Sequence, residues 1–181
     1  LARRNEDLAI FEMGSVYWPQ ESELLPREAP MMAGLVTGKV PGGWQGKKGE
    51  LDFFFLKGIV EELFARLHLE GVKFSPAMPE HSYHPGRYAV ITAGDIRIGN
   101  IGEIHPRVLE RIDIESRVCA FEIDVDRLYE AITLSGHRIQ GISKYPAVKR
   151  DLALVVPEEV NAADLAETIK KSGTDLLVKV E

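Results

Sequence analysis

Three histidines lie close together in the chain and could supply ligands to a metal ion. His81 and His84 have a spacing that suits zinc, and the carboxylates of Glu80 and Glu103 could join them and His105. A proline directly follows both His84 and His105, which is typical of turns. We therefore expect these imidazoles to be held by hydrogen bonds to backbone carbonyls, and we predict no metal site.

A glycine-rich run at residues 42–49 looks at first like a loop that could hold a phosphate. A P-loop requires Gly-Lys followed by Ser or Thr, and a further glycine five positions before that Gly-Lys pair. Here Lys48 follows Lys47, and Pro41 occupies the position of the first glycine. The run is therefore predicted to be a flexible surface loop.

Ser15 is a candidate nucleophile, but its neighbours do not form the Gly-x-Ser-x-Gly pattern of a nucleophile elbow. Glu12, Glu103 and Asp124 lie on separate predicted strands of one sheet, where they could converge. General acid–base catalysis needs a defined separation between such groups, which a sequence does not give. We expect solvated or hydrogen-bonded carboxylates, and we predict no catalytic residue in this chain.

The one locally basic stretch spans residues 137–150 and contains no acidic residue. The whole chain has a net charge of −6, so any role in nucleic-acid binding would have to be local. Lys and Arg supply the salt-dependent part of RNA affinity, and a tyrosine among them can stack on a base. The predicted RNA-binding residues are Arg138, Lys144, Tyr145, Lys149 and Arg150. The alternative is that Lys149 is solvated and Arg150 forms a structural ion pair.

The 181 residues, 45% of them hydrophobic, suffice for one substantial core or for one domain and part of a second. No segment approaches the roughly 20 apolar residues that a membrane-spanning helix needs, so no membrane partner is expected. The single cysteine, Cys119, excludes an intrachain disulfide and fits a cytoplasmic location. Because the chain begins with Leu1 and stops within an apolar run, we expect it to be part of a longer protein.

Alternating patterns and turn signals predict an α+β fold with a sheet in the first part of the chain. The expected strands are 9–18, 31–37, 88–92, 96–104 and 118–125, and the expected helices are 51–69, 106–112 and 126–132. In the last strand Cys119, Phe121, Ile123 and Val125 point one way and form a strongly apolar face. Asp126 is expected to cap the helix that follows.

The helix predicted over 51–69 carries three consecutive phenylalanines, Phe53, Phe54 and Phe55. Consecutive helical residues cannot all face one side, so at least one ring should point away from the local core. Exposed apolar patches usually mark interaction sites. We therefore predict that these three residues contribute to a subunit interface.

A polar stretch with two glycines marks the expected domain boundary. We expect a first domain over residues 1–136 and a second over residues 143–181. The second is predicted to contain a strand over 150–156, a helix over 162–171 and a strand from 176 to 181. A strand–helix–strand order of this kind opens an α/β sandwich.

Five segments, taken together, resemble the beta subunit of bacterial phenylalanyl-tRNA synthetase. They are residues 8–14 (LAIFEMG), 52–58 (DFFFLKG), 84–89 (HPGRYA), 98–106 (IGNIGEIHP) and 145–152 (YPAVKRDL). The first four are similar to the catalytic-like module of that family, an antiparallel sheet of the class II aminoacyl-tRNA synthetase type flanked by helices. The fifth is similar to the start of its ferredoxin-like anticodon-binding domain, a β-α-β unit that would be truncated here.

This resemblance implies a non-catalytic module that packs against the alpha subunit in an α2β2 tetramer and contributes to binding tRNA(Phe). The alpha subunit would use ATP and Mg, and this chain would hold no cofactor of its own. Active members of the class place a phosphate-binding arginine after a Gly-x-Gly-x-x-Arg run. The nearest segment, residues 99–104, contains no arginine and carries Glu103, whose charge would repel a phosphate.

Two other functions stay open at this point. One is a repurposed class II enzyme, which would need arginines to hold the phosphates of ATP. Arg87 is the best placed candidate in a pool that consists of Arg27, Arg87, Arg97 and Arg107. The other is an amino-acid-binding sensor module, which would require a complete second domain.

Overall fold

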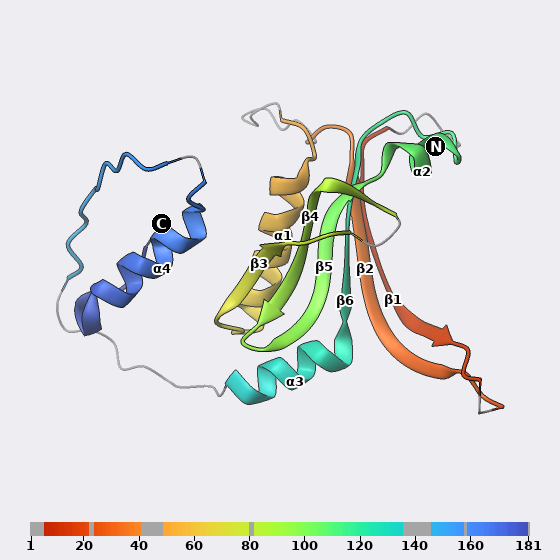
Figure 1. The fold of residues 1–181 in the computed structure, drawn as a ribbon, viewed down its shortest axis with the longest axis horizontal. Helices are drawn as coiled ribbons and strands as arrows, with labels where there is room; N and C mark the ends of the chain where they lie inside the picture. The colour runs from red at the N-terminus through yellow and green to blue at the C-terminus, as the bar shows by residue number, and fades with distance from the viewer. Residues whose placement is uncertain are drawn as a thin grey trace. The chain divides into compact units, whose positions relative to one another are not determined.

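Figure 1 shows a computed structural model of the chain, which describes residues 6–21, 24–40, 49–79, 82–135, 146–157 and 159–180. The chain divides into two compact units, residues 1–137 and residues 138–181.

The first unit is built on a six-stranded antiparallel sheet with the spatial order β1-β2-β6-β5-β4-β3. The strands are β1 (Leu8–Trp18), β2 (Arg27–Thr37), β3 (Val72–Pro76), β4 (Tyr83–Ala93), β5 (Ile96–Ile104) and β6 (Val118–Asp124). The sixth strand, β6, lies between β2 and β5 and so joins the strands on either side into one sheet. The predicted α+β class with an antiparallel sheet is confirmed.

The register of β6 decides which side chains enter the core. Cys119, Phe121 and Ile123 are buried on one face of the sheet, as the alternating pattern predicted. Ala120 and Glu122 lie on the opposite face, because successive residues of a strand alternate between faces. Val125 was expected to share the buried face, but it already belongs to the following helix.

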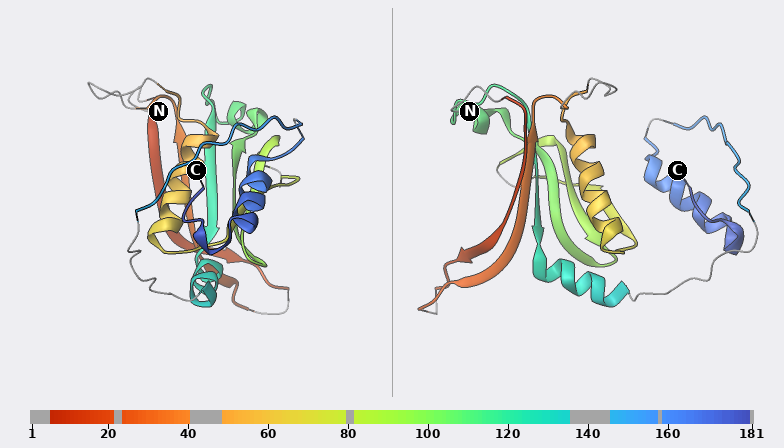
Figure 2. Two further views of the ribbon diagram at one scale, coloured as in Figure 1. Left: turned by 90° about the vertical axis from the view of Figure 1, so that its left-hand side faces the viewer. Right: turned by 180° about the vertical axis from the view of Figure 1, so that it is seen from behind.

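Three helices accompany the sheet: α1 (Phe53–Arg66), α2 (Pro106–Glu110) and α3 (Val125–Ser135). α1 contacts β5 and β6, and α3 contacts β2, β5 and β6. Figures 1 and 2 show α1 running along the sheet and α3 extending from the end of β6. The two helices complete the core with Leu56, Val60, Phe64, Leu128 and Ala131. They therefore cover the sheet face that carries Cys119.

α1 begins where a carboxylate accepts a hydrogen bond from its free backbone amides. The Oδ1 atom of Asp52 accepts from the N–H of Phe55 at 2.9 Å, which is the standard N-cap arrangement. The helix ends before His68, whose φ of 54° lies outside the helical region. Both ends therefore fall inside the predicted span of 51–69.

Several boundaries differ from the prediction for local reasons. β2 and β4 begin earlier than expected, and β3 was not predicted because its sequence, VKFSP, alternates over only four residues before a proline. Pairing with β4 supplies the backbone hydrogen bonds that hold this short strand in place. The cap of α3 was assigned to the wrong residue: Asp124, not Asp126, accepts a hydrogen bond from the N–H of Arg127 at 3.0 Å.

The second unit contains the predicted helix, α4 (Ala162–Ser172), followed by a 3₁₀ turn at Thr174–Leu176. The two predicted strands are wrong: residues 146–157 and the residues described after the 3₁₀ turn are not in strands. Leu152 is 69% exposed and Val178 is 82% exposed. Alternation alone does not hold a strand, which needs a neighbour to complete its hydrogen bonds. The ferredoxin-like β-α-β unit is therefore not formed in the described residues.

Within the described part of the chain, no helix is long and apolar enough to span a lipid bilayer.

A pair of glycines tests how tightly the sheet is packed. A methyl group on Gly99 would collide with the backbone carbonyl of Glu122, whereas one on Gly58 of α1 would meet nothing within 4 Å. We expect Gly99→Ala to lower the free energy of unfolding by about 3 kcal/mol through overpacking. Gly58→Ala should raise it by about 1 kcal/mol, because alanine loses less backbone entropy in a helix. Urea denaturation of both variants measures the difference, and equal effects would contradict the packing described.

Candidate functional site

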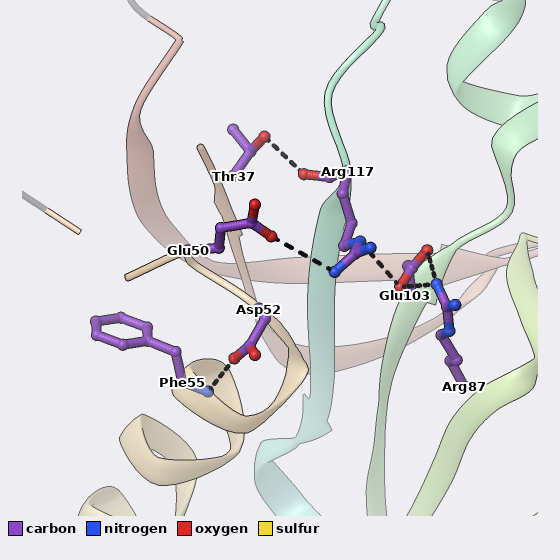
Figure 3. Close-up of polar contacts among 7 residues, drawn as sticks. All are labelled: Thr37, Glu50, Asp52, Phe55, Arg87, Glu103 and Arg117. Carbon is purple, nitrogen blue, oxygen red and sulfur yellow. Dashed lines mark hydrogen bonds and ion pairs between the residues drawn. The ribbon is translucent and has the colours of Figure 1, made fainter. Parts of the chain in front are cut away.

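A buried carboxylate near one end of the sheet holds two arginines (Figure 3). Glu103 of β5 is 7% exposed. The Nη1 atom of Arg87 donates to both of its carboxylate oxygens at 2.8 Å. The Nε atom of Arg117 lies 3.5 Å from the Oε2 atom of Glu103, and Arg117 also approaches Glu50 at 3.8 Å. Burying a carboxylate without a partner costs free energy, so Glu103 requires the positive charges of Arg87 and Arg117 beside it.

This pairing occupies the arginine that was the best candidate for a phosphate contact. The guanidinium of Arg87 is committed to Glu103. Arg27 lies over the ring of Trp18 at 5.4 Å from its centroid, and Arg97 donates to the hydroxyl of Tyr88 at 3.4 Å. Arg107 is exposed on α2, a separate element. Three members of the predicted pool therefore have intramolecular partners.

The opposite face of the sheet carries a cavity of about 500 Å³. Its lining comes from β1, β2, β4, β5 and β6 and from Ser82, and it includes Ile10, Glu12, Ala33, Leu35, Tyr83, Asn100, Ile104, Ala120 and Glu122. The register pairs Ala33 with both Glu12 and Glu122, so these three side chains share one face. No Lys or Arg is among the described residues that line the cavity.

Polar groups gather at the β5–β6 side of this cavity. Glu122 accepts hydrogen bonds from the hydroxyl of Tyr83 at 3.5 Å and from the amide nitrogen of Asn100 at 3.4 Å. The Oδ1 atom of Asn100 is buried and has no hydrogen-bond partner among the described residues. Sequence reasoning missed all three residues, although the alternation of β6 already placed Glu122 opposite its buried face.

The carboxylates singled out from the sequence are divided between the two faces. Glu103 lies on the face of Cys119, its register partner. Glu12 and Asp124 lie on the other face, and Glu12 lines the cavity. The three groups do not converge, and the expected default of hydrogen-bonded or solvated carboxylates describes them.

His84 and His105 are both involved in local backbone contacts. The Nδ1 atom of His84 accepts from the N–H of Gly86, and that of His105 accepts from the N–H of Arg107, each at 3.1 Å. The sequence predicted hydrogen bonds to backbone carbonyls, which is wrong for these two Nδ1 atoms, because both accept from backbone amides. No group of three or more metal-binding side chains occurs among the described residues. His81 and the glycine-rich residues 41–48 lie outside that part of the chain.

Two of the three phenylalanines at the start of α1 point outward. Phe54 is 76% exposed and Phe55 is 37% exposed, whereas Phe53 packs against the core. The prediction that at least one ring leaves the core is confirmed. Ile59, one turn further along, is 44% exposed and extends the apolar surface. We call Phe54, Phe55 and Ile59 the outer face of α1.

The predicted RNA-binding residues fall into two groups. Arg138, Lys144 and Tyr145 lie outside the described residues. Lys149 and Arg150 are exposed in the second unit, and none of the ion pairs found among the described residues involves them.

The chain shares its fold with an aminoacyl-tRNA synthetase. Its structure is similar to that of a pyrrolysyl-tRNA synthetase from Desulfitobacterium hafniense, with a TM-score of 0.50 and 15% identity. The match covers 71% of this chain and 43% of that one. At this identity the likeness defines the class of fold alone: an antiparallel sheet of the class II synthetase type with flanking helices.

Sequence comparison is more specific. Residues 1–125 match the family model described as the phenylalanyl-tRNA synthetase beta chain CLM domain, and residues 143–181 match that of the ferredoxin-fold anticodon-binding domain. The chain belongs to the phenylalanyl-tRNA synthetase beta chain family.

Curated relatives agree with this assignment. The chain is 41% identical to phenylalanine–tRNA ligase beta subunits from Moorella thermoacetica and Symbiobacterium thermophilum, over 97% and 98% of its length. It spans 22% and 20% of the length of these relatives.

Cys119 provides a pH-dependent test of the core beside Glu103. Burial, and to a smaller extent the charge of Glu103, raises the pKa of this thiol from 9.0 to about 11, while Arg117 opposes the shift. The pKa is higher in the folded than in the unfolded chain. The protonated thiol of Cys119 therefore contributes fully to stability below pH 9, and this contribution is lost as the pH rises from 9.0 to about 11.

Between pH 9.0 and about 11, we expect the free energy of unfolding of the unsubstituted chain to fall by about 2 kcal/mol more than that of the Cys119→Val variant. Valine fills a similar volume and does not titrate, so it removes the contributions of other groups from the comparison. Urea denaturation at pH values on either side of the interval measures the difference. Parallel pH profiles for the two proteins would show that the thiol is not held protonated by its surroundings.

Proposed function

We propose that this chain is a non-catalytic part of the beta subunit of a bacterial phenylalanine–tRNA ligase. It packs against the alpha subunit and supports the aminoacylation of tRNA(Phe), which the alpha subunit carries out with ATP, Mg and phenylalanine. The proposal includes an α2β2 tetramer in the cytoplasm. The relatives named beta subunit, at 41% identity, support this assignment.

The observation that carries the proposed non-catalytic role is the negative charge of the open sheet face. Activation of an amino acid by ATP develops negative charge, which fixed cations must stabilise. The cavity on the open face is lined by Glu12 and Glu122 and by no cation among the described residues. The guanidinium of Arg87 is held by Glu103. A triphosphate placed on this face would meet carboxylates, which repel it.

The outer face of α1 supports a role in subunit contact. Phe54, Phe55 and Ile59 form an apolar surface on a helix whose other side is fixed in the core. Aromatic side chains on rigid elements are typical anchors of protein interfaces. In this proposal the alpha subunit covers this surface.

The second unit is the part that we assign to tRNA. Its match to an anticodon-binding domain supports this assignment, as do the exposed side chains of Lys149 and Arg150. Phosphate contacts by such residues contribute affinity without sequence specificity. Arg138, Lys144 and Tyr145 belong to the same basic stretch of sequence, and we assign them to RNA contact as well.

The test is complex formation with a tagged alpha subunit from the genome that encodes this chain. We expect a stable equimolar complex in light scattering. Phe54→Ser should raise the dissociation constant about tenfold or more, because it removes a central aromatic anchor.

Tyr129→Ser is the matched control. Tyr129 is 71% exposed on α3, close to the 76% of Phe54, so both variants remove a similar exposed ring. Its effect should stay below about twofold if the contact lies on α1. A folded chain that forms no complex, or equal losses in both variants, would overturn the placement of this interface.

A further inference from the structure

The outer edge of β1 is a long apolar strand edge that has no partner strand among the described residues. β1 pairs with β2 along all of Leu8–Trp18 and ends the six-stranded sheet on that side, as Figure 1 shows. Phe11 is 75% exposed and Met13 is 56% exposed. Such an edge readily pairs with another strand, because its outward backbone groups lack partners. We propose that β1 pairs antiparallel with β1 of a second copy of this chain, so that the two sheets join at a two-fold axis.

The sequence of β1 lacks the features that commonly protect a strand edge. Natural edges are often blocked by Lys, by Pro or by a β-bulge. Residues 8–18 contain no Lys, Arg or Pro, and the pairing of β1 with β2 runs without a shift in register. Glu12 is the one charged residue in this range. The edge is therefore open to pairing along its whole length.

Charge and length select one register among those that a two-fold axis allows. When Met13 faces Met13 of the second copy, all eleven residues of each strand are paired. Glu12 then lies opposite Gly14 of the second copy, so no like charges meet. A pair centred on Glu12 would instead place the two carboxylates directly opposite each other, which is destabilising. A pair centred on Gly14 would leave the first two residues of each strand unpaired.

The same register places large side chains opposite small ones. The odd-numbered residues of β1 lie on the sheet face that carries the buried Val36, the register partner of Ala9. Phe11 lies opposite Ser15 of the second copy, and Tyr17 lies opposite Ala9 of the second copy. Each exposed ring therefore has room to cover apolar surface on the other copy, and pairing removes part of both rings from water.

Sedimentation velocity of the 181-residue chain at about 1–200 µM tests the association. We expect a dimer with a dissociation constant of roughly 10 µM, because an interface between two strand edges is small. Met13→Lys should weaken dimerisation about tenfold or more, since two lysines would face each other at the two-fold axis. Met78→Lys is the matched control: Met78 is 86% exposed and lies outside β1, so its replacement should leave dimerisation unchanged.

A cross-link between thiols tests the register and does not depend on the lysine variant. Met13→Cys places two thiols opposite each other, with Cβ atoms roughly 5 Å apart, and should form an interchain disulfide under mild oxidation. Phe11→Cys is the matched control on the same face. Its two thiols would be offset by four residues along the strands, roughly 13 Å, which is too far for a disulfide. Cys119 is fully buried and common to all variants.

Three results would overturn the proposal: a chain that stays monomeric up to about 200 µM, equal dimerisation of Met13→Lys and Met78→Lys, or equal cross-linking of Met13→Cys and Phe11→Cys. Self-association that is lost in Phe54→Ser and kept in Met13→Lys would also overturn it, because the contact would then lie on the outer face of α1. The proposal rests on β1 alone, and none of these results requires or excludes binding of the alpha subunit. The proposed function and this inference therefore fail separately.

Discussion

The strands β2, β6 and β5 each turn one face toward α1 or α3 and the other away from these helices, and the rest of the molecule follows from that division. The register of β6 places Cys119, Phe121 and Ile123 in the core and Glu122 on the open face. Gly99 allows β5 to approach β6 closely enough for this register. A shift by one residue would exchange every side chain between the faces, so the apolar face fixes the register.

The same division separates the charged groups of the sheet. Glu103 falls on the core face, where its burial requires Arg87 and Arg117 as partners. Glu122 and Glu12 fall on the open face, where they make the cavity acidic. Among the described residues, the cavity lining therefore contains no Lys or Arg, and the guanidinium of Arg87 is paired with Glu103 on the other face.

Strong local signals made much of the fold predictable. Composition located β1, a turn signal located β5, and alternation located β6. The amphipathic pattern located α1, and the run of three phenylalanines predicted that at least one ring would leave the core. The short β3 was missed because pairing with β4, a tertiary interaction, defines it. The strand predicted over 150–156 was wrong because alternation cannot replace a missing neighbour. The carboxylate of Glu103 was noticed, but its two arginine partners lie on β4 and directly before β6, which sequence spacing does not reveal.

The most direct test of the central claim is the affinity of this chain for ATP with Mg, measured by equilibrium dialysis. The account predicts no saturable binding at concentrations up to about 5 mM, since the open face repels phosphates and Arg87 is already paired. Saturable binding with a dissociation constant below about 1 mM, abolished by Arg87→Ala, would contradict it. That result would show that Glu103 releases its arginine to the nucleotide and that the class II site is still in use.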